Sequence, residues 1–212
     1  MRTDLVFLDS RVPDYRQLAE AWSGTADVFI LDAATDGLAQ ILAHLQGRSG
    51  VDALHLVSHG SAGSVVLGNT VLDATALASR AAQLAGIGSA LSDSGDILLY
   101  GCNVAEGEAG VRFLGAWAEA TGADVAASTN LTGAIERGGD WQLEAGAGTI
   151  EAQALVPAAG YATSLSSITG TDGGDSLIGT VDDDVLSAYA GSDFLDGKGG
   201  NILVWGDETA RV

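Results

Sequence analysis

Residues 54–60 read LHLVSHG, a short apolar run that ends at a histidine followed by a glycine. A second run at 97–102, ILLYGC, ends at a glycine followed by the single cysteine of the chain. Short apolar runs of this kind are typical of strands that are buried on both faces of a sheet. Similar runs lie at 5–8, 28–31 and 124–127, and stretches of helical periodicity separate them. The sequence therefore predicts an α/β domain, with a mostly parallel sheet and helices on both faces.

The segments between these runs carry signals for helices and for one hairpin. Asp36 stands where it can cap a helix, and Gly68-Asn69 separates two short apolar runs, which is typical of a tight β-hairpin. The spacing of apolar residues predicts helices over about 14–22, 36–45, 73–91 and 106–121.

The chain is strongly acidic. Its 212 residues include 28 Asp and Glu against 9 Lys and Arg, a formal net charge of −19. Nucleic acids and anionic membranes are bound through clustered Lys and Arg, so we expect neither as a partner. A multivalent cation fits this charge better. No apolar stretch approaches the length of about 18 residues that a transmembrane helix needs, so none is expected.

Composition changes after residue 144 and again near residue 169. Between these points Ala, Gly, Ser and Thr dominate, and the larger apolar residues, among them Leu155 and Leu165, follow no period. Such a composition is typical of a linker. We expect three parts: an α/β domain at 1–146, a linker at 147–168 and a repeat tail at 169–212.

The tail has a nine-residue period. Aspartates recur at 175, 184 and 193, and a leucine follows each of them by two residues. In such nonapeptides the leucine points into a parallel β-roll, while Asp carboxylates and Gly carbonyls supply the hard oxygen ligands that Ca²⁺ prefers. The competing interpretation is an acidic, glycine-rich disordered tail. The expected calcium ligands are Asp175, Asp184, Asp193, Gly170, Asp172, Gly179 and Asp182.

These repeats resemble those of RTX proteins over about residues 170–200. The resemblance implies calcium binding outside the cell and type I secretion to the medium or the cell surface. We expect no cleavable signal peptide, because a strand-like run follows Met1-Arg2-Thr3 at once. Val181 and Ala190 depart from the RTX pattern, and the register shifts after Gly197, so the roll is short or continues in a longer protein.

His59 and Cys102 each follow the end of a predicted strand. In an open α/β sheet the carboxyl ends of the strands form the edge where ligands bind. If the two strands are neighbours, both side chains face one crevice, where a thiolate and a proton carrier can act together. Gly60 lets the chain turn closely, so that its N–H can point into the site.

The surroundings of both residues resemble the caspase-like cysteine peptidases. The similarity covers the histidine loop and hairpin at 58–68 and the strand end at 99–104. The segments at 99–104 and 138–141 are also similar to an N-terminal domain of giant repeat-bearing bacterial adhesins. The resemblance implies that His59 is the catalytic histidine, that Cys102 is the nucleophile, and that the N–H groups of Gly60 and Cys102 form the oxyanion hole. The caspase pentapeptide around the cysteine is absent, and no residue is assigned to a specificity pocket.

Two functions follow as hypotheses. The first is a cysteine endopeptidase that acts on peptides, including its own linker in cis, with Leu155 and Leu165 as candidate cleavage residues. The second is a non-catalytic cap or adhesion module that keeps the fold without the chemistry. A catalytic Cys102 is expected to be partly exposed, whereas a buried sulfur favours the inert module. His44 and His55 are expected to be structural, and the sequence gives no indication of the oligomeric state.

Overall fold

The computed structural model describes residues 2–165, 167–169, 176–178, 184–189, 192–196 and 202–206. The chain divides into two compact units, Met1–Leu165 and Ser166–Val212. Each unit is described by itself below. No helix in the described part of the chain is long and apolar enough to cross a membrane.

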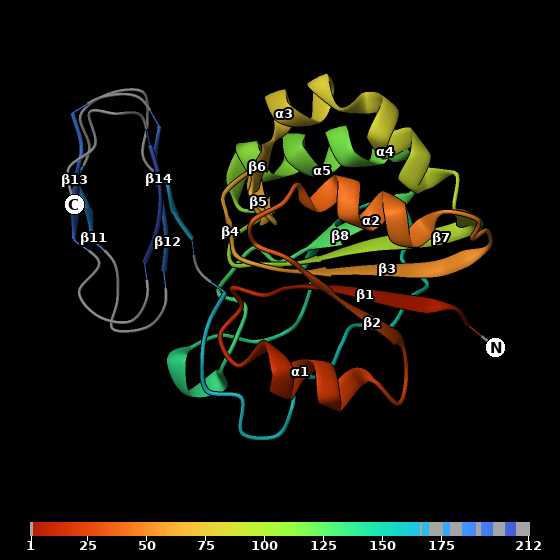
Figure 1. Ribbon diagram of the computed structural model, residues 1–212, viewed down its shortest axis with the longest axis horizontal. Helices are drawn as coiled ribbons and strands as arrows, with labels where there is room; N and C mark the ends of the chain where they lie inside the picture. Colours follow the sequence, from red (N-terminus) through yellow and green to blue (C-terminus); the bar gives the residue numbers. More distant parts are fainter. Residues whose placement is uncertain are drawn as a thin grey trace. The chain divides into compact units, whose positions relative to one another are not determined.

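A six-stranded sheet forms the centre of the first unit (Figure 1). Five neighbouring strands run parallel, and the strand at one edge runs antiparallel. The prediction of a mostly parallel α/β sheet is confirmed. In spatial order the strands are β2 (Asp27–Leu31), β1 (Asp4–Asp9), β3 (Val51–Val57), β7 (Leu91–Tyr100), β8 (Asp124–Ala127) and β9 (Ala145–Ala147).

Helices cover both faces of this sheet. Figure 1 shows α-helices on the lower face and on the upper face of the sheet. The Asp36 side chain accepts a hydrogen bond from the Ala39 N–H, as expected of a helix cap, and Asp73 does the same for Ala76. The lower helix is α1 (Tyr15–Trp22), and the upper ones are α2 (Gly37–Leu45), α3 (Ala74–Ser79), α4 (Ala81–Gly88) and α5 (Gly107–Thr121).

The single helix predicted over residues 73–91 is wrong in two respects. Arg80 leaves the helical conformation, with φ −113° and ψ 19°, and it divides the segment into α3 and α4. Its guanidinium hydrogen-bonds the Asp36 carboxylate, the cap of α2. The predicted helix also overlaps the next strand, because β7 already begins at Leu91.

The predicted hairpin is confirmed. Strands β5 (Ser64–Leu67) and β6 (Thr70–Asp73) pair antiparallel, and β4 (Gly60–Ser61) adds a third, short strand. Gly68 turns the chain with φ +57°, and a side chain there would collide with the carbonyl oxygen of Thr35. The histidine loop therefore continues directly into this small sheet.

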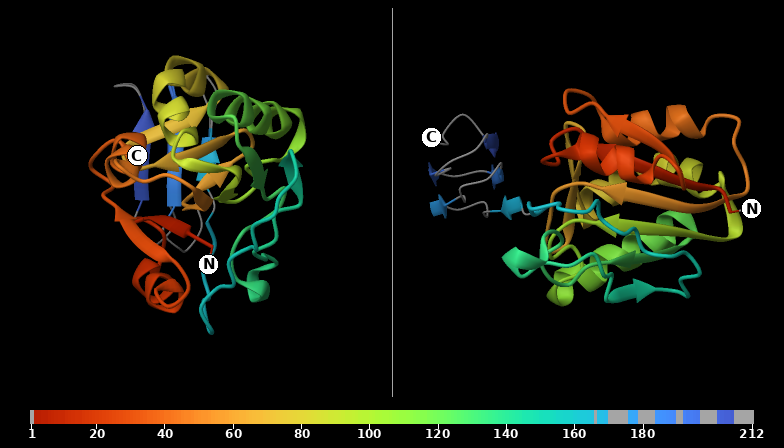
Figure 2. Two further views of the ribbon diagram at one scale, coloured as in Figure 1. Left: turned by 90° about the vertical axis from the view of Figure 1, so that its right-hand side faces the viewer. Right: turned by 90° about the horizontal axis from the view of Figure 1, so that it is seen from below.

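The lower face of the central sheet is covered differently from the upper face. Residues 148–165, which we call the strap, follow β9 and cross this face beside α1 (Figure 2). Inside the strap no helix or extended strand forms. Its buried residues Tyr161 and Leu165 nevertheless belong to one apolar cluster with Tyr100, Cys102 and Trp141. The expected linker is thus part of the packed first unit as far as Leu165.

The described strands of the second unit form two small parallel sheets. Paired strands are two nine-residue repeats apart: Ser176 pairs with Phe194, and Ser167 with Val185. The repeat leucines Leu177, Leu186 and Leu195 are buried together, so the predicted β-roll with inward leucines is confirmed. One sheet contains β10 (Ser167–Thr169), β12 (Asp184–Tyr189) and β14 (Ile202–Gly206), and the other β11 (Ser176–Ile178) and β13 (Phe194–Asp196).

Candidate functional site

His59 and Cys102 follow two strands that are direct neighbours. The ladder of β3 and β7 ends with the pair Val57 and Tyr100, and the Ser58 N–H still donates to the Tyr100 carbonyl at 2.9 Å. Each candidate residue stands two positions beyond this last pair. Both therefore lie at the carboxyl edge of the sheet, on adjacent strand ends.

The two loops that carry these residues touch through their backbones. A Cβ atom on Gly101 would lie 3.1 Å from the Gly60 nitrogen, and one on Gly60 would lie 2.4 Å from a methyl carbon of Val104. Neither position has room for a side chain. Glycine at both positions lets the backbone N–H groups approach each other.

Two backbone donors of these loops meet at one oxygen. The Gly60 N–H and the Cys102 N–H donate to the Leu165 carbonyl at 3.1 and 3.2 Å. These are the two N–H groups to which the resemblance to caspase-like peptidases assigns the oxyanion hole. Paired N–H donors aimed at one carbonyl oxygen are the arrangement that stabilises developing negative charge in acyl transfer.

The end of the strap is held by backbone hydrogen bonds to the loop at 132–134. The Leu165 N–H donates to the Thr132 carbonyl at 2.9 Å, and the Ala134 N–H donates to the Thr163 carbonyl at 2.9 Å. Gly133 and Ser164 form an antiparallel bridge between these bonds. A side chain on Gly133 would lie 2.5 Å from the Thr163 carbonyl oxygen, so this approach requires glycine.

The imidazole of His59 has a defined orientation. Its Nε2 lies 3.2 Å from the Arg11 carbonyl oxygen, which accepts hydrogen bonds and cannot donate them. Nε2 therefore donates its hydrogen to this carbonyl, and the bond fixes the orientation of the ring. Arg11 is itself fixed by a double hydrogen bond to the buried Asp9, at 2.9 and 2.8 Å. Asp9 also accepts from the Gly68 N–H at 2.8 Å.

Comparison with known families agrees with the division into two units. Residues 5–165 match the family described as a domain of unknown function, DUF4347. The chain belongs to the DUF4347 family. Residues 169–201 match the RTX calcium-binding nonapeptide repeat, so the predicted calcium-binding repeats are confirmed. Such repeats are typical of proteins exported by type I secretion. No curated protein and no solved structure matches the chain.

Cys102 of the DUF4347 domain is buried, with 3% of its surface exposed. Its thiol donates to the Thr132 carbonyl at 3.3 Å and accepts from the Thr132 N–H at 3.2 Å. Burial raises the pKa of the Cys102 thiol to about 12, so the thiol is protonated near neutral pH. The expectation of a partly exposed thiol is therefore wrong, because the strap and the loop at Thr132 cover the sulfur.

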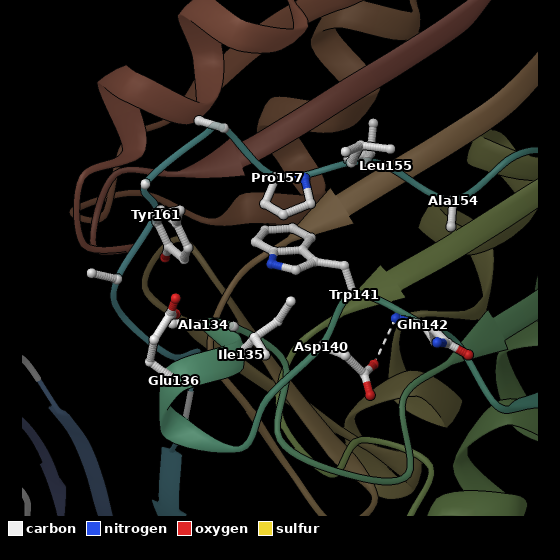
Figure 3. A pocket seen from close by; sticks show the side chains of 15 residues that line it. Ala134, Ile135, Glu136, Asp140, Trp141, Gln142, Ala154, Leu155, Pro157 and Tyr161 are labelled. Atoms are coloured by element: carbon white, nitrogen blue, oxygen red, sulfur yellow. Dashed lines mark hydrogen bonds between the residues drawn. The ribbon is translucent and has the colours of Figure 1, made fainter.

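An apolar cavity of the DUF4347 domain lies beside the strap, apart from His59 and Cys102. It has a volume of about 480 Å³ and is lined by the strap and by residues 133–142, without His59 or Cys102. Figure 3 shows the Trp141 indole between Pro157 and Tyr161, with Leu155 nearby. Trp141 also packs edge-on against Trp22 of α1.

Backbone groups along the strap are bound by side chains from the rest of the DUF4347 domain. Asp96 of β7 accepts from the N–H groups of Glu151 and Ala152, and Tyr100 Oη accepts from the Leu155 N–H at 2.8 Å. No local sequence pattern predicts these contacts. Further bonds to strap carbonyls come from Arg2 to Glu151, Trp22 to Val156, Gln17 to Ala159 and Arg137 to Ala162.

Two of the seven expected calcium ligands lie in the described part of the roll. Asp184 begins β12, and Asp193 precedes β13 with 3% of its surface exposed. Calcium ligation by Asp184 and Asp193 stays a prediction. The other five, Gly170, Asp172, Asp175, Gly179 and Asp182, lie outside the described residues.

A cluster of three carboxylates lies at the other end of the central strands from His59 and Cys102. Oxygen atoms of Asp96, Asp124 and Glu151 lie within 4.8 Å of one another. Burial of Asp96 raises its pKa, and the charges of Glu151 and Asp124 act in the same direction. Two strap N–H groups and the nearby Arg2 already contact Asp96, which indicates a structural anchor for the start of the strap.

Proposed function

We propose that the DUF4347 domain is a cysteine endopeptidase of caspase-like mechanism, with Cys102 as the nucleophile and His59 as the base. One observation carries the proposal: the N–H groups of Gly60 and Cys102 converge on the carbonyl oxygen of one peptide, that of Leu165. When a nucleophile attacks such a carbonyl, negative charge develops on this oxygen, and preorganised N–H donors stabilise it. The resemblance of both loops to the caspase-like peptidases supports the same roles.

The proposed reaction is acyl transfer to sulfur followed by hydrolysis. Cys102 Sγ attacks the carbonyl carbon of the bound peptide while the thiol proton passes to Nδ1 of His59. The C–N bond breaks as His59 returns this proton to the leaving amine. Water then hydrolyses the thioester, which gives a carboxylate and restores the thiol.

The Arg11 carbonyl has a positioning role in this scheme. It accepts the Nε2–H of His59 and so fixes the orientation of the ring. A third group that orients the histidine is the general logic of catalytic triads. Because the Cys102 thiol is protonated in the covered site, His59 has to take the proton during the attack itself.

The peptidase would operate as part of a secreted protein. The repeats bind calcium and are of the RTX type, and we propose that they accompany the DUF4347 domain through type I secretion to the medium or the cell surface. We further propose that the α/β domain and the strap form one functional unit, and that the repeat tail begins after the strap.

A second candidate function is supported by a specific observation. Cys102 is almost fully buried, and its pKa is raised to about 12, as for an inert core cysteine. A non-catalytic cap or adhesion module with this fold would have the same buried thiol. The convergent N–H groups favour the peptidase, and the buried thiol favours the module.

A direct test compares wild type with Cys102→Ser and His59→Gln after each is refolded from urea. Intact mass of the chain and gel analysis of added casein, at several calcium concentrations, report cleavage in cis and in trans. We expect wild type alone to cleave its own chain, while circular dichroism verifies that both variants fold. If wild type and Cys102→Ser leave the chain and casein equally intact, the peptidase is excluded and the non-catalytic module is the function.

A further inference from the structure

We infer that the strap is the substrate of this site, and that the scissile bond joins Leu165 to Ser166. The inference rests on the proposed peptidase and specifies what that peptidase cuts. The carbonyl held by the N–H groups of Gly60 and Cys102 belongs to Leu165, the last residue of the first unit. The DUF4347 match also ends at Leu165.

The backbone of residues 163–165 is bound as a peptidase binds a peptide. Leu165 donates its N–H to Thr132, and Thr163 accepts from Ala134, so the strap end pairs antiparallel with the loop at 132–134 through a single bridge. Such pairing binds any sequence in extended form and fixes the register of the peptide. Here the register puts the Leu165 carbonyl between the two N–H donors.

The side chain of Leu165 gives the specificity. It is fully buried in the apolar cluster that also contains Tyr100, Trp141 and Tyr161. An apolar environment of this kind accepts a medium-sized aliphatic side chain and strongly disfavours a charged one. The substrate class is therefore an extended peptide with leucine on the amino side of the cut.

Cleavage at this bond separates the two units. Attack by Cys102 gives a thioester to Leu165 and frees the amine of Ser166, and hydrolysis leaves a carboxylate on Leu165. The products are residues 1–165 and the repeat-bearing residues 166–212. The reaction needs only water as a co-reactant.

The cut chain keeps its own product in the site. The strap remains joined to β9, and side chains bind its backbone at several points between Glu151 and Ala162. This tether gives the new carboxyl end a high effective concentration at the site, which an added peptide has to exceed. The DUF4347 domain therefore acts once, to release the tail, and does not turn over other substrates.

The test follows wild type after dilution from urea, with fragment masses and N-terminal sequencing. We expect a new N-terminus at Ser166, one cut per chain, and a half-time that is independent of protein concentration. The cleaved protein should leave added casein intact. A half-time that shortens in proportion to concentration, or continued digestion of casein after the chain is cut, would overturn the single-turnover inference.

Matched substitutions test the leucine. Leu165→Ala should slow the cut by at least about tenfold, because it removes several buried carbon atoms from the recognised side chain. Leu155→Ala lies in the same strap and should leave the rate within about twofold of wild type. Ser166→Pro changes only the leaving side and should block the cut while the thermal melting temperature of the first unit is kept.

The outcomes separate this inference from the proposed function. A Cys102-dependent cut at another bond would leave the peptidase standing and overturn the assignment of Leu165. Equal slowing of the cut by Leu165→Ala and Leu155→Ala would also overturn the assignment of Leu165 without excluding the peptidase. If no bond is cut in the chain or in casein, the proposed function itself has failed.

Discussion

The Nε2 atom of His59 lies 3.2 Å from the carbonyl oxygen of Arg11, although 48 residues separate them in the chain. Arg11 is held in turn by Asp9, at the end of the neighbouring strand β1. The orientation of the candidate base thus depends on an ion pair that does not belong to its own loop.

Breaking this ion pair should reduce both stability and cleavage. Asp9→Ala leaves the Arg11 guanidinium, which is mostly buried, without its carboxylate, and we expect a loss of about 3 kcal/mol in unfolding free energy. It should also slow any self-cleavage, since the Arg11 carbonyl positions His59. Urea unfolding measures the first effect. The control is Asp4→Ala, whose ion pair with Arg2 is partly exposed and should contribute less than about 1 kcal/mol. Equal losses in both variants would contradict the assignment.

The Cys102 thiol should react slowly and with an unusual pH dependence. Burial raises its pKa to about 12, so the thiolate fraction of the folded protein keeps rising about tenfold per pH unit past pH 9. In urea the same thiol should level off near its ordinary pKa of about 8.5. Iodoacetamide labelling followed by mass spectrometry gives both profiles. A native profile that levels off near pH 8.5 would mean that the strap does not cover the sulfur.

Gly133 should control how firmly the strap pairs with its loop. In Gly133→Ala the new methyl would collide with the Thr163 carbonyl, which lies 2.5 Å from the Cβ position, so the strap end has to move. We expect faster alkylation of Cys102 and a lower melting temperature. Gly115→Ala is the matched control, because nothing lies within 4 Å of its Cβ position in α5. It should stabilise the protein by about 1 kcal/mol through helix propensity. Unchanged alkylation in Gly133→Ala would contradict the observed pairing.

Acid should loosen the strap through His55. The Leu155 N–H donates to Tyr100 Oη, and the Tyr100 hydroxyl lies 3.3 Å from Nδ1 of His55. Burial, together with the charge of Arg2, lowers the pKa of His55 to about 4. Since the folded-state pKa lies below the unfolded value, this contribution to stability is fully present above about pH 6.5 and is lost as the pH falls toward 4.

The corresponding measurement is unfolding free energy at pH 7 and at pH 4.5. His55→Gln should reduce the difference between the two values by about 2 kcal/mol, because a glutamine does not take up the proton. An identical pH dependence in wild type and His55→Gln would exclude His55 as the titrating group.

The repeat tail should fold with calcium. Carboxylates at a nine-residue period repel one another until a cation joins them, so ion binding and folding are coupled. Circular dichroism should show added β structure in calcium but not in magnesium, which demands a smaller and more regular site. Asp193→Asn should raise the calcium concentration required, whereas Glu208→Gln, beyond the matched repeats, should not. A tail with the same β content in a chelator would contradict this coupling.

The strands and the edge that carries His59 and Cys102 could be predicted because they have strong local signals. Apolar runs ending in Ser-His-Gly and Tyr-Gly-Cys mark buried strands, and the ends of neighbouring parallel strands meet at one edge. The inward leucines of the tail could be predicted equally well, because aspartate and leucine recur with the same nine-residue period. In each case a short stretch of sequence contains the whole signal.

The covering of the site could not be predicted in the same way. The strap has no hydrophobic period, and single side chains far away in sequence, such as Trp22, Asp96 and Tyr100, bind its backbone. His59 is likewise supported by the backbone carbonyl of Arg11. Every residue type has such a carbonyl, so the sequence does not reveal this contact. At the break, Arg80 forms a tertiary ion pair with Asp36. The spacing of apolar residues within one helix gives no indication of such a distant partner.

The strap begins at the antiparallel strand β9 and ends at the loops after β3 and β7. The chain therefore leaves the first unit at the same edge that holds His59 and Cys102. Any cargo fused after residue 165 would be joined to the unit at that edge, whatever its fold or length. The point at which a further domain can be fused is therefore also the point at which the proposed cleavage would release it.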